Sequence, residues 1–524
     1  MNIGPLFMTL LLAPAAALAQ KPVINAGGVV NAAGLLPVSQ PWSGLAPGSI
    51  AAVFGGNLAS VTMPAPGFPL PLSLGGASVT VNGAKAPLFY VSPNQINFQV
   101  PSNAPWSYAA YGQISIVVTT AAGSSNAVVA DVVGTNAMIF TQDGGGCGHP
   151  GAIVNVSADG KRSLNSRDNS VEPGEFIELY GTGLGAVYNP PPDGSPASSN
   201  PTSRTIETVG VSFEPQTGSI PTQSEFSGRA PGLVGVDQVN AMVPVGVREG
   251  CSVPVLIGLV PATISIRTGG GPCVDPPIQS AGSLLLQRSI VLNDSTVPET
   301  DSLLGSFSAS PGKQVPPPLI QMLPDGIENL SQTLSPTCAI PGYSTPDAGV
   351  IAITGPGLPP AIGVPPATSN GVTSYNGMLP AGSISTGTYQ ISAEGGNGIG
   401  EFQVPVAVGP GIQITSQFPQ GQVHQGISGF VVTWTGGEAG EAVTVTVVQH
   451  EVGFDHVCLQ VVPATAGVVT FDYIFYNILA FVSSEIDVQV GPDPTQPQTF
   501  TAPGLTLGGQ VSWAIVYRFV GLTF

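Results

Sequence analysis

The side chains best suited to chemistry in this 524-residue sequence are a few cysteines, histidines and carboxylates that lie close together along the chain. Cys147 and His149 share a glycine-rich stretch, in which a flexible backbone could bring a thiolate and an imidazole together as nucleophile and base. No third residue can be assigned to orient the imidazole. We therefore interpret this stretch as a plain loop between two domains.

A second group is the densest set of potential metal ligands, and it consists of His450, Glu451, Asp455 and His456. The group follows the strand-like residues 442–448, so it is predicted to lie in a loop. The ordinary polarity of loops explains it more simply than a bound metal does. Paired carboxylates for glycoside hydrolysis can come from distant strands of a sandwich, but no pair stands out in this sequence.

The motifs of several enzyme classes are missing from the sequence. It contains no Gly-x-Ser-x-Gly nucleophile elbow, no His-Glu-x-x-His, no P-loop and no Gly-x-Gly-x-x-Gly that opens a helix. The run at residues 181–185 looks like a nucleotide-binding loop, but its place inside a repeated β unit indicates a turn. We therefore predict no catalytic, cofactor-binding or metal-binding residues, and no cofactor.

The cysteines are few, and none forms a CxxC pair of the kind that binds zinc. They are Cys147, Cys251, Cys273, Cys338 and Cys458. Cys251 opens the strand-like residues 251–258, and Cys273 follows a second strand-like run at 263–268. A hairpin of these two runs would return the chain beside its start, which predicts a disulfide between Cys251 and Cys273. Because the number is odd, at least one cysteine stays unpaired within the chain, and we expect Cys147 to be unpaired.

An internal repeat organises the first half of the chain. Residues 47–58 recur 126 positions later as residues 173–184, with matching Pro-Gly, apolar core and Gly-rich turn before Leu. Residues 86–101 and 230–244 form a second matching pair in the same order. The larger offset of this pair is explained by a polar, Pro-rich insertion around Tyr188 to Pro201.

Each repeated unit contains about seven short strand-like runs separated by turn residues, which is typical of a small β-sandwich. Alternation within one run places Val79 and Val81 on the side of the core. The 69 glycines and 53 prolines are interpreted as turn residues, because 43% of the chain is apolar and can form cores. We predict an all-β protein of tandem immunoglobulin-like β-sandwich domains, with the first two at residues 24–134 and 135–275.

The motifs of these two units together resemble the uncharacterised Solibacter-type C-terminal domain family of exported acidobacterial proteins, over roughly residues 24–275. The motifs lie at residues 46–51, 87–101, 151–155, 163–166 and 173–185. The Pro-Gly element is also similar to the opening of IPT/TIG immunoglobulin-like domains. The resemblance implies an exported, immunoglobulin-like module. It assigns no role to particular residues, because the family has no established activity.

The second half of the chain has a different composition at its start. Residues 276–345 are rich in Pro, Ser and acidic groups, and we interpret them as extended segments and linker. Alternation resumes in a third sandwich at 346–408, as part of 280–408, and in a fourth at 409–524. The apolar residues 471–482 are ambiguous between a buried strand pair and a short helix.

The N-terminus and the charge bear on where the protein works. Residues 1–19 are apolar and end in Ala17-Leu18-Ala19, so a cleaved signal peptide is predicted, with an uncleaved anchor or a merely apolar tail as the alternatives. No stretch is long enough for a transmembrane span. The net charge of −18 repels phosphate backbones and disfavours nucleic acid as a partner.

These features favour a secreted or cell-surface, non-enzymatic protein that mediates adhesion or binds a glycan or a protein through loops on rigid sandwiches. An extracellular hydrolase, or its accessory modules, is the alternative, because it would share the same export signal and domains.

Overall fold

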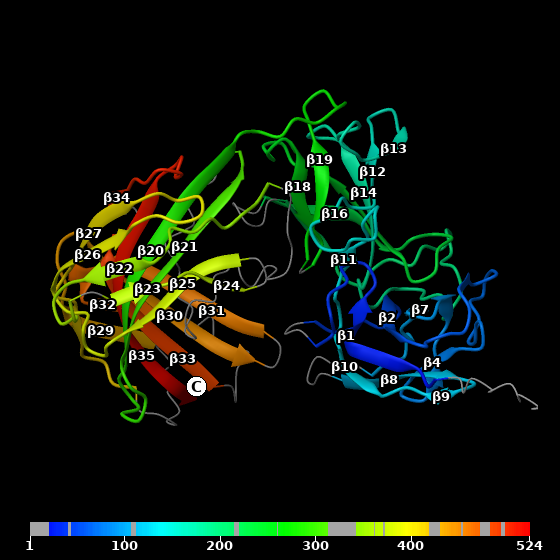
Figure 1. The fold of residues 1–524 in the computed structure, drawn as a ribbon, viewed down its shortest axis with the longest axis horizontal. Helices are drawn as coiled ribbons and strands as arrows, with labels where there is room; N and C mark the ends of the chain where they lie inside the picture. The colour runs from blue at the N-terminus through cyan, green and yellow to red at the C-terminus, as the bar shows by residue number, and fades with distance from the viewer. Residues whose placement is uncertain are drawn as a thin grey trace, which may run out of the picture. The chain divides into compact units, whose positions relative to one another are not determined.

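The computed structural model describes residues 20–39, 43–105, 112–213, 220–258, 260–312, 342–360, 362–369, 372–418, 430–451, 454–471, 483–493 and 498–523. The predicted signal peptide lies outside these residues, as does all of the ambiguous segment after Phe471. Within them the fold is all-β, as predicted, with the three-residue 3-10 helix η1 (Ala464–Ala466) as the only helix (Figure 1). No helix of the described residues is long and apolar enough to cross a membrane.

The first repeat is a sandwich of two antiparallel sheets. One sheet has the order β1 (Val23–Asn31), β2 (Ile50–Gly56), β7 (Gln95–Gln99), β6 (Leu88–Val91), β3 (Met63–Pro64). The other has the order β10 (Val128–Val132), β8 (Gly112–Thr120), β4 (Ser78–Val81), β5 (Ala84–Lys85), with β9 (Gly123–Ser124) beside β8. One apolar cluster takes side chains from both sheets, among them Val53, Ile96 and Val118, and it includes the predicted inward residues Val79 and Val81.

The strands that carry the repeated motifs recur in the second repeat, where they belong to a single nine-stranded sheet. Its order is β13 (Arg162–Leu164), β12 (Ile153–Val156), β14 (Phe176–Thr182), β17 (Asp237–Met242), β16 (Ile220–Arg229), β15 (Gly210–Phe213), β18 (Gly250–Leu256), β19 (Ala262–Ile266), with β11 (Met138–Ile139) beside β14. The ten-residue strand β16 is long enough to pair with both β17 and β15, and this connects what are two sheets in the first repeat.

The two repeated elements occupy equivalent places in their units. In the first, the amide of Gly48 donates to Val100 O at 3.0 Å and the amide of Val100 donates to Ser49 O at 2.8 Å. In the second, Gly174 donates to Val243 O at 2.8 Å, and Val243 donates to Glu175 O at 2.9 Å. Both glycines have positive φ, which favours glycine over other residues. The prolines that precede these glycines therefore open equivalent turns.

The Gln-x-Asn motif of each repeat also makes the same contact. Gln95 Nε2 donates to Asn97 Oδ1 at 2.8 Å in β7, and Gln238 Nε2 donates to Asn240 Oδ1 at 2.9 Å in β17. Residues two apart in a strand share a face, so the motif places two amides side by side. The internal repeat read from the sequence is thus a repeat of structure.

The chain folds into two compact units whose boundaries differ from the predicted domains at 24–134 and 135–275. The first unit contains the described residues up to 137 and two segments of the second repeat, at 182–206 and 228–237. The second unit contains residues 138–181, 207–227 and 238 onward. The segment 182–206 belongs to the first unit because it carries the Pro-rich insertion, which hydrogen-bonds to the first repeat.

Residues 276–345 were predicted to be extended segments and linker, and their first part forms paired strands rather than linker. Two long strands, β20 (Ile278–Val291) and β21 (Thr300–Pro311), pair from Ile278 with Pro311 to Ser289 with Thr300. Leu284, Leu286 and Leu303 from these strands lie in the main core of this half. Serine and glycine at other positions of these strands weaken the apolar pattern in the sequence, although the backbone forms a full ladder. Residues 313–341 lie outside the described residues.

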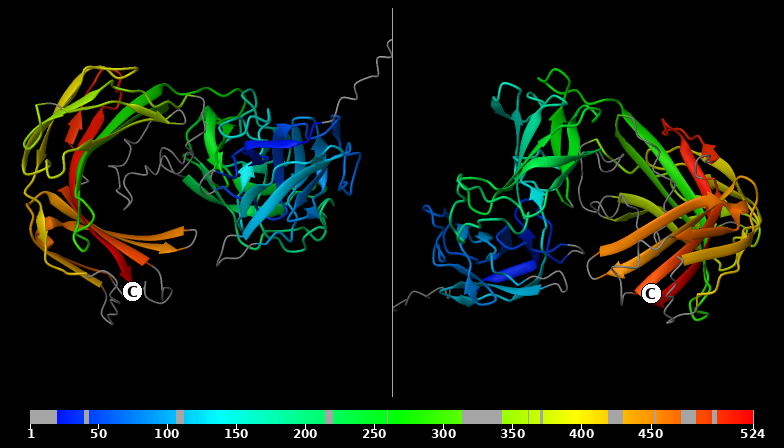
Figure 2. Two further views of the ribbon diagram at one scale, coloured as in Figure 1. Left: turned by 60° about the horizontal axis from the view of Figure 1, so that its bottom comes forward. Right: turned by 180° about the vertical axis from the view of Figure 1, so that it is seen from behind.

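The predicted third and fourth sandwiches, at 346–408 and 409–524, share one sheet and one core. The sheet has the order β24 (Ala367–Ser369), β25 (Val372–Leu379), β21, β20, β35 (Gly509–Thr523), β33 (Ser483–Pro492), β30 (Glu441–Glu451), β31 (Phe454–Pro463), with β34 (Gln498–Phe500) beside β35. Strands β20 and β35 pair in parallel, which joins the two ends of this half (Figure 2). A local reading of strand runs cannot foresee such a distant pairing.

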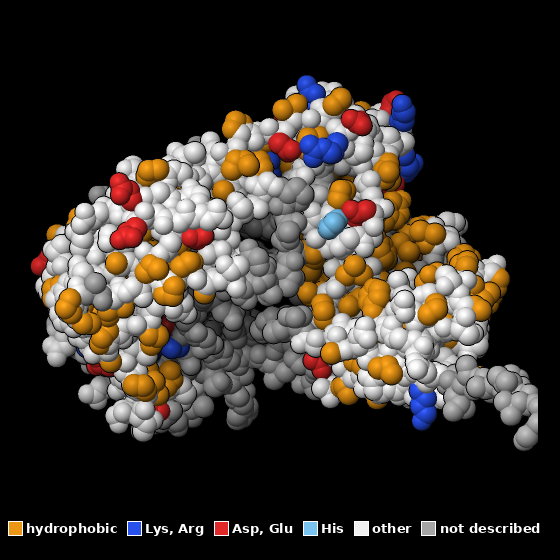
Figure 3. Space-filling view, viewed as in Figure 1, with side chains coloured by type: hydrophobic (Ala, Val, Ile, Leu, Met, Phe, Trp, Pro, Cys, Tyr) orange, Lys and Arg blue, Asp and Glu red, His pale blue; other side chains and the backbone are white. Residues whose placement is uncertain are grey.

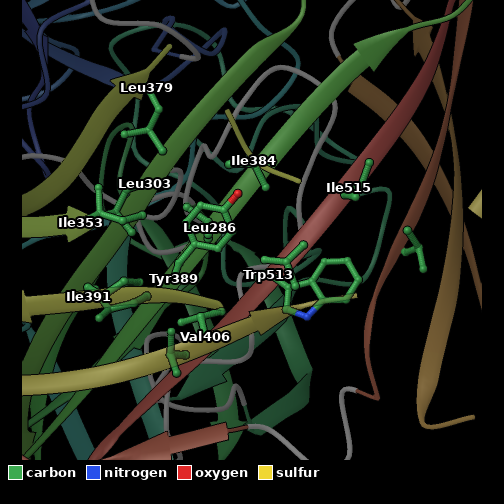
Figure 4. Packing of buried hydrophobic residues seen from close by; sticks show 14 of the residues in the cluster. Leu286, Leu303, Ile353, Leu379, Ile384, Tyr389, Ile391, Val406, Trp513 and Ile515 are labelled. Carbon is green, nitrogen blue, oxygen red and sulfur yellow. The ribbon is translucent and has the colours of Figure 1, made fainter. Parts of the chain in front are cut away.

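Two smaller sheets complete this half. They are β23 (Ile362–Val364), β22 (Ile351–Thr354), β26 (Gly387–Ala393), β27 (Phe402–Val408) and β28 (Ile412–Ile414), β29 (Phe430–Gly436), β32 (Val468–Phe471). Figure 4 shows Leu286, Tyr389, Val406 and Trp513 among the side chains that these sheets and the large sheet bring together. Strand β27 follows a strict alternation of buried and exposed residues, as predicted for a half-buried strand.

Tyr375 of β25 gives this core a dependence on pH. Its side chain is 2% exposed and its hydroxyl accepts a hydrogen bond from the amide of Ala348 at 2.7 Å. Burial raises the pKa of Tyr375 to about 12. Below pH 10 the phenol is protonated in both the folded and the unfolded chain. Between pH 10 and 12 the unfolded chain loses the proton first, so stability falls as the pH rises.

We therefore expect the stability advantage of the native protein over a Tyr375→Phe variant to shrink by about 2 kcal/mol between pH 9 and pH 11.5. Urea unfolding of the two proteins at both pH values measures this difference. The contributions of the other tyrosines to the pH dependence cancel, because both proteins contain them. An advantage that stays constant over this range would contradict the role assigned to Tyr375.

Candidate binding surface

The structure removes the cysteine and histidine pair as a candidate for nucleophilic chemistry. Cys147 is disulfide-bonded, so it is not a free thiolate and its predicted unpaired state is wrong. His149 Nδ1 lies 2.8 Å from Asp143 Oδ2, and Asp143 Oδ1 accepts a hydrogen bond from the amide of Gly145. The hydrogen bond from His149 lowers the pKa of Asp143. The pair holds the loop together at the surface.

The second group of polar residues lies on strands rather than in a loop. The register of the β30–β31 hairpin pairs His450 with Asp455 and Gln449 with His456, so only residues 452 and 453 separate the strands. The strand predicted at 442–448 continues to Glu451. Their side chains lie outside the described residues. Among the side chains that the structure does describe, no three His, Cys, Asp or Glu residues are grouped to hold a metal.

The disulfide predicted between Cys251 and Cys273 is present, with a Cα–Cα distance of 5.2 Å. Strands β18 and β19 form the expected hairpin, in which Gly250 pairs with Ile266. The amide of Cys251 also donates to Asp275 Oδ1 at 2.7 Å. The disulfide and this hydrogen bond fasten the chain that leaves the second repeat to the start of β18.

Several motif residues of the second repeat form a buried amide network. Asn165 is 3% exposed, and its Nδ2 donates to Asn155 Oδ1 and to Ser265 O, both at 2.9 Å. Its Oδ1 accepts from the amide of Ser265 at 2.8 Å. All three bonds tie the loop after β13 to β12 and β19. These motif residues therefore have a structural role.

Replacing Asn165 by leucine should lower the free energy of unfolding of this part of the chain by about 2–4 kcal/mol, because Asn155 Oδ1 and the amide of Ser265 would be left without a hydrogen bond. A matched control is Gln403→Leu, at an exposed position of β27, which should change stability by less than about 0.5 kcal/mol. Urea unfolding of both variants checks the prediction. Equal stability of the two would show that the network contributes nothing.

The Pro-rich insertion of the second repeat is fastened to the first repeat. The amide of Leu70 donates to Gly194 O at 2.8 Å, and the amide of Gly194 donates to Gln99 Oε1 at 2.6 Å. Gly194 has φ +78°, and a Cβ there would lie 3.2 Å from the amide nitrogen of Leu70. The amide of Ser102 donates to the Asp193 carboxylate at 3.1 Å. The loops at 68–72 and 188–194 are thus held against each other.

The base of the insertion is a short two-stranded ribbon. Val187 pairs with Thr205, and the amide of Tyr188 donates to Arg204 O at 2.8 Å. Alternation along the ribbon places Tyr188 and Ile206 on the face opposite to Val187. Their side chains are 58% and 56% exposed, so this face of the ribbon is open to solvent.

A buried ion pair fixes the backbone at the start of the ribbon. Arg229 forms a hydrogen-bonded ion pair with Asp237, and their side chains are 7% and 0% exposed. The guanidinium also donates to Gly185 O, which immediately precedes the ribbon, and to Pro47 O of the first repeat. Burial raises the pKa of Asp237, while Arg229 and the amide of Leu184 favour its charged form. Arg229 is therefore a positioning residue for this surface.

The first unit carries both exposed aromatic side chains of the described residues. Phe68 is 55% exposed and Tyr188 is 58% exposed, and every other described side chain among the exposed large hydrophobic ones is aliphatic. Figure 3 shows apolar side chains gathered over the loops next to β2 and β7. We define the candidate binding surface as residues 68–72 and 186–206. The insertion is visible in the sequence, and the structure shows that it meets the loop at 68–72.

No protein-family model matches the chain, and no curated protein matches it. Among solved structures, a tetra-tandem repeat in the extending region of a large adhesion protein is 11% identical, covers 90% of this chain and 95% of its own, and has a TM-score of 0.13.

Two further solved structures were found at similar levels. The FN1–FN3 domains of chicken CNTN1 are 10% identical over 68% of this chain and 96% of their own, with a TM-score of 0.17. Dimeric latent PorU from Porphyromonas gingivalis is 12% identical over 70% of this chain and 34% of its own, with a TM-score of 0.16. These scores carry no argument about function. The class of the protein, a multi-domain all-β protein of immunoglobulin-like sandwiches, follows from its own sheets.

Proposed function

We propose that this chain is an exported, non-enzymatic adhesion protein, which binds a glycan or a protein at the cell surface through rigid loops of its first unit. The observation that carries the proposal is the exposure of Phe68 and Tyr188 on two loops that are hydrogen-bonded to each other. Covering an exposed aromatic ring with a ligand removes apolar surface from water, which lowers the free energy of the complex. Because the loops are already ordered, little entropy is lost on binding.

Export is part of the proposal, and two features of the sequence support it. Residues 17–19 have the small-x-small pattern of a signal-peptidase site, and the motifs of residues 24–275 resemble those of an exported family. The mature chain would then begin at or near Gln20. An oxidising compartment also suits the disulfide between Cys251 and Cys273.

Mass spectrometry of the native protein, combined with protease treatment of intact cells, tests this proposal. We expect the first peptide to start at or near Gln20 and the chain to be cleaved while the cells remain sealed. A protein that retains Met1 and stays protected inside the cells would overturn the proposed location and, with it, the function.

A further inference from the structure

We propose that the partner of the candidate binding surface is a neutral glycan, whose sugar rings stack on Phe68 and Tyr188. This inference rests on the proposed function and makes its ligand specific. A pyranose ring has a flat face of C–H groups and a rim of hydroxyl groups. Such a ligand needs an exposed aromatic ring beside neutral groups that can both donate and accept hydrogen bonds.

The two rings meet the first need because the backbone around each is fixed. Phe68 lies two residues before Leu70, whose amide is bonded to Gly194 O of the insertion. Tyr188 is held by its own amide, which donates to Arg204 O. Because hydrogen bonds fix the main chain of both loops, a sugar that stacks on either ring does not have to order a loop.

Neutral amide side chains of the insertion meet the second need. Asn189 and Asn200 are both exposed, and neither amide side chain has a hydrogen-bond partner among the described residues. Ser203 Oγ donates to Asn189 O at 2.7 Å, so the backbone of Asn189 is fixed beside Tyr188. An amide can donate to one sugar hydroxyl while it accepts from another, which suits the rim of a pyranose.

Charge selects a neutral glycan over an acidic one. Asp193 adds a carboxylate to the insertion, where it accepts a hydrogen bond from the amide of Ser102. The whole chain carries a net charge of −18, which repels polyanions such as uronic-acid polymers. A protein partner is the competing possibility, and it is separated from a glycan by the experiment.

Affinity electrophoresis of the mature chain in gels that contain soluble polysaccharides tests the inference. The neutral probes are hydroxyethylcellulose, xyloglucan, galactomannan and laminarin, and the anionic probe is alginate. We expect at least one neutral polymer to retard the protein and alginate not to. Tyr188→Ala and Phe68→Ala should each weaken binding at least tenfold, while Tyr188→Phe should stay within about threefold because the ring is kept.

Val129→Ala is the matched control, since Val129 is 59% exposed on β10 of the same unit but lies outside the candidate surface. Its binding should equal that of the native protein, and circular dichroism and thermal midpoints verify that all variants are folded. The inference would be overturned if no neutral polymer retards the protein, if only alginate does, or if both alanine variants are retarded as strongly as the native chain. If the ring variants nevertheless lose binding to cell envelopes, the proposed function stands with a protein as the partner.

Discussion

Replacing Arg229 by alanine should destabilise the first unit by about 3–5 kcal/mol, because the carboxylate of Asp237 would remain buried without a counter-charge. The 0% exposure of Asp237 leaves no route to solvent, and Gly185 O and Pro47 O would also lose their donor. At about 2–4 °C per kcal/mol, the melting transition of this unit should fall by roughly 6–20 °C.

The matched control replaces both partners. A double variant, Arg229→Met with Asp237→Leu, removes the charges together and should be much closer to the native stability than Arg229→Ala alone. Differential scanning calorimetry of the whole chain measures both. If the single and double variants melt at the same temperature, the buried charge is not what makes the single change costly.

Removing the disulfide between Cys251 and Cys273 should cost about 3 kcal/mol, because the closed loop spans 22 residues and restricts the unfolded chain. The variant is Cys251→Ala with Cys273→Ala, which leaves the disulfide of Cys147 in place. Urea unfolding of the second unit measures the loss. Met378→Ala, at an exposed position of the same unit, serves as the control and should change stability by less than about 0.5 kcal/mol.

Peptide mapping tests the pairing directly. Trypsin cleaves after Arg248, Arg267 and Arg288, which separates the two cysteines onto peptides 249–267 and 268–288. Without reduction these peptides should be recovered as one linked species. Recovery of both peptides alkylated and separate, from folded and exported protein, would show that the disulfide does not form.

The sequence predicted most where its patterns are local or repeated. The Pro-Gly turns and the Gln-x-Asn motifs recur at spacings that only a repeated unit explains, and the structure gives them the same hydrogen bonds in both units. The disulfide followed from two adjacent strand-like runs, because a hairpin is the commonest way to connect such runs. These predictions needed no knowledge of distant contacts.

Distant contacts account for what the sequence did not predict. Strand β20 pairs with β35 more than 200 residues away. Local patterns could not show that this pairing joins the two predicted sandwiches of the second half. Serine and glycine within β20 and β21 made these strands look like linker. The partner of Cys147 is likewise not encoded in its own surroundings, which contain only glycine, His149 and Pro150.

The candidate binding surface was predicted only in part. The insertion at 188–201 stood out as the cause of the larger offset between the repeats. Nothing in its residues showed that Gly194 would bond to Gln99 and Leu70 of the other repeat, or that Tyr188 would stay exposed. Polar composition indicated a loop, and contacts between repeats determine where that loop is held.

The most direct test of the recognition surface is the binding of the purified mature chain to isolated cell envelopes of the organism that produces it. We predict saturable sedimentation of the native chain with the envelopes, and at least tenfold weaker sedimentation of a folded Phe68→Ala, Tyr188→Ala double variant. The Val129→Ala control should sediment like the native chain. Equal sedimentation of the double variant and the native chain would contradict the assignment of recognition to these loops.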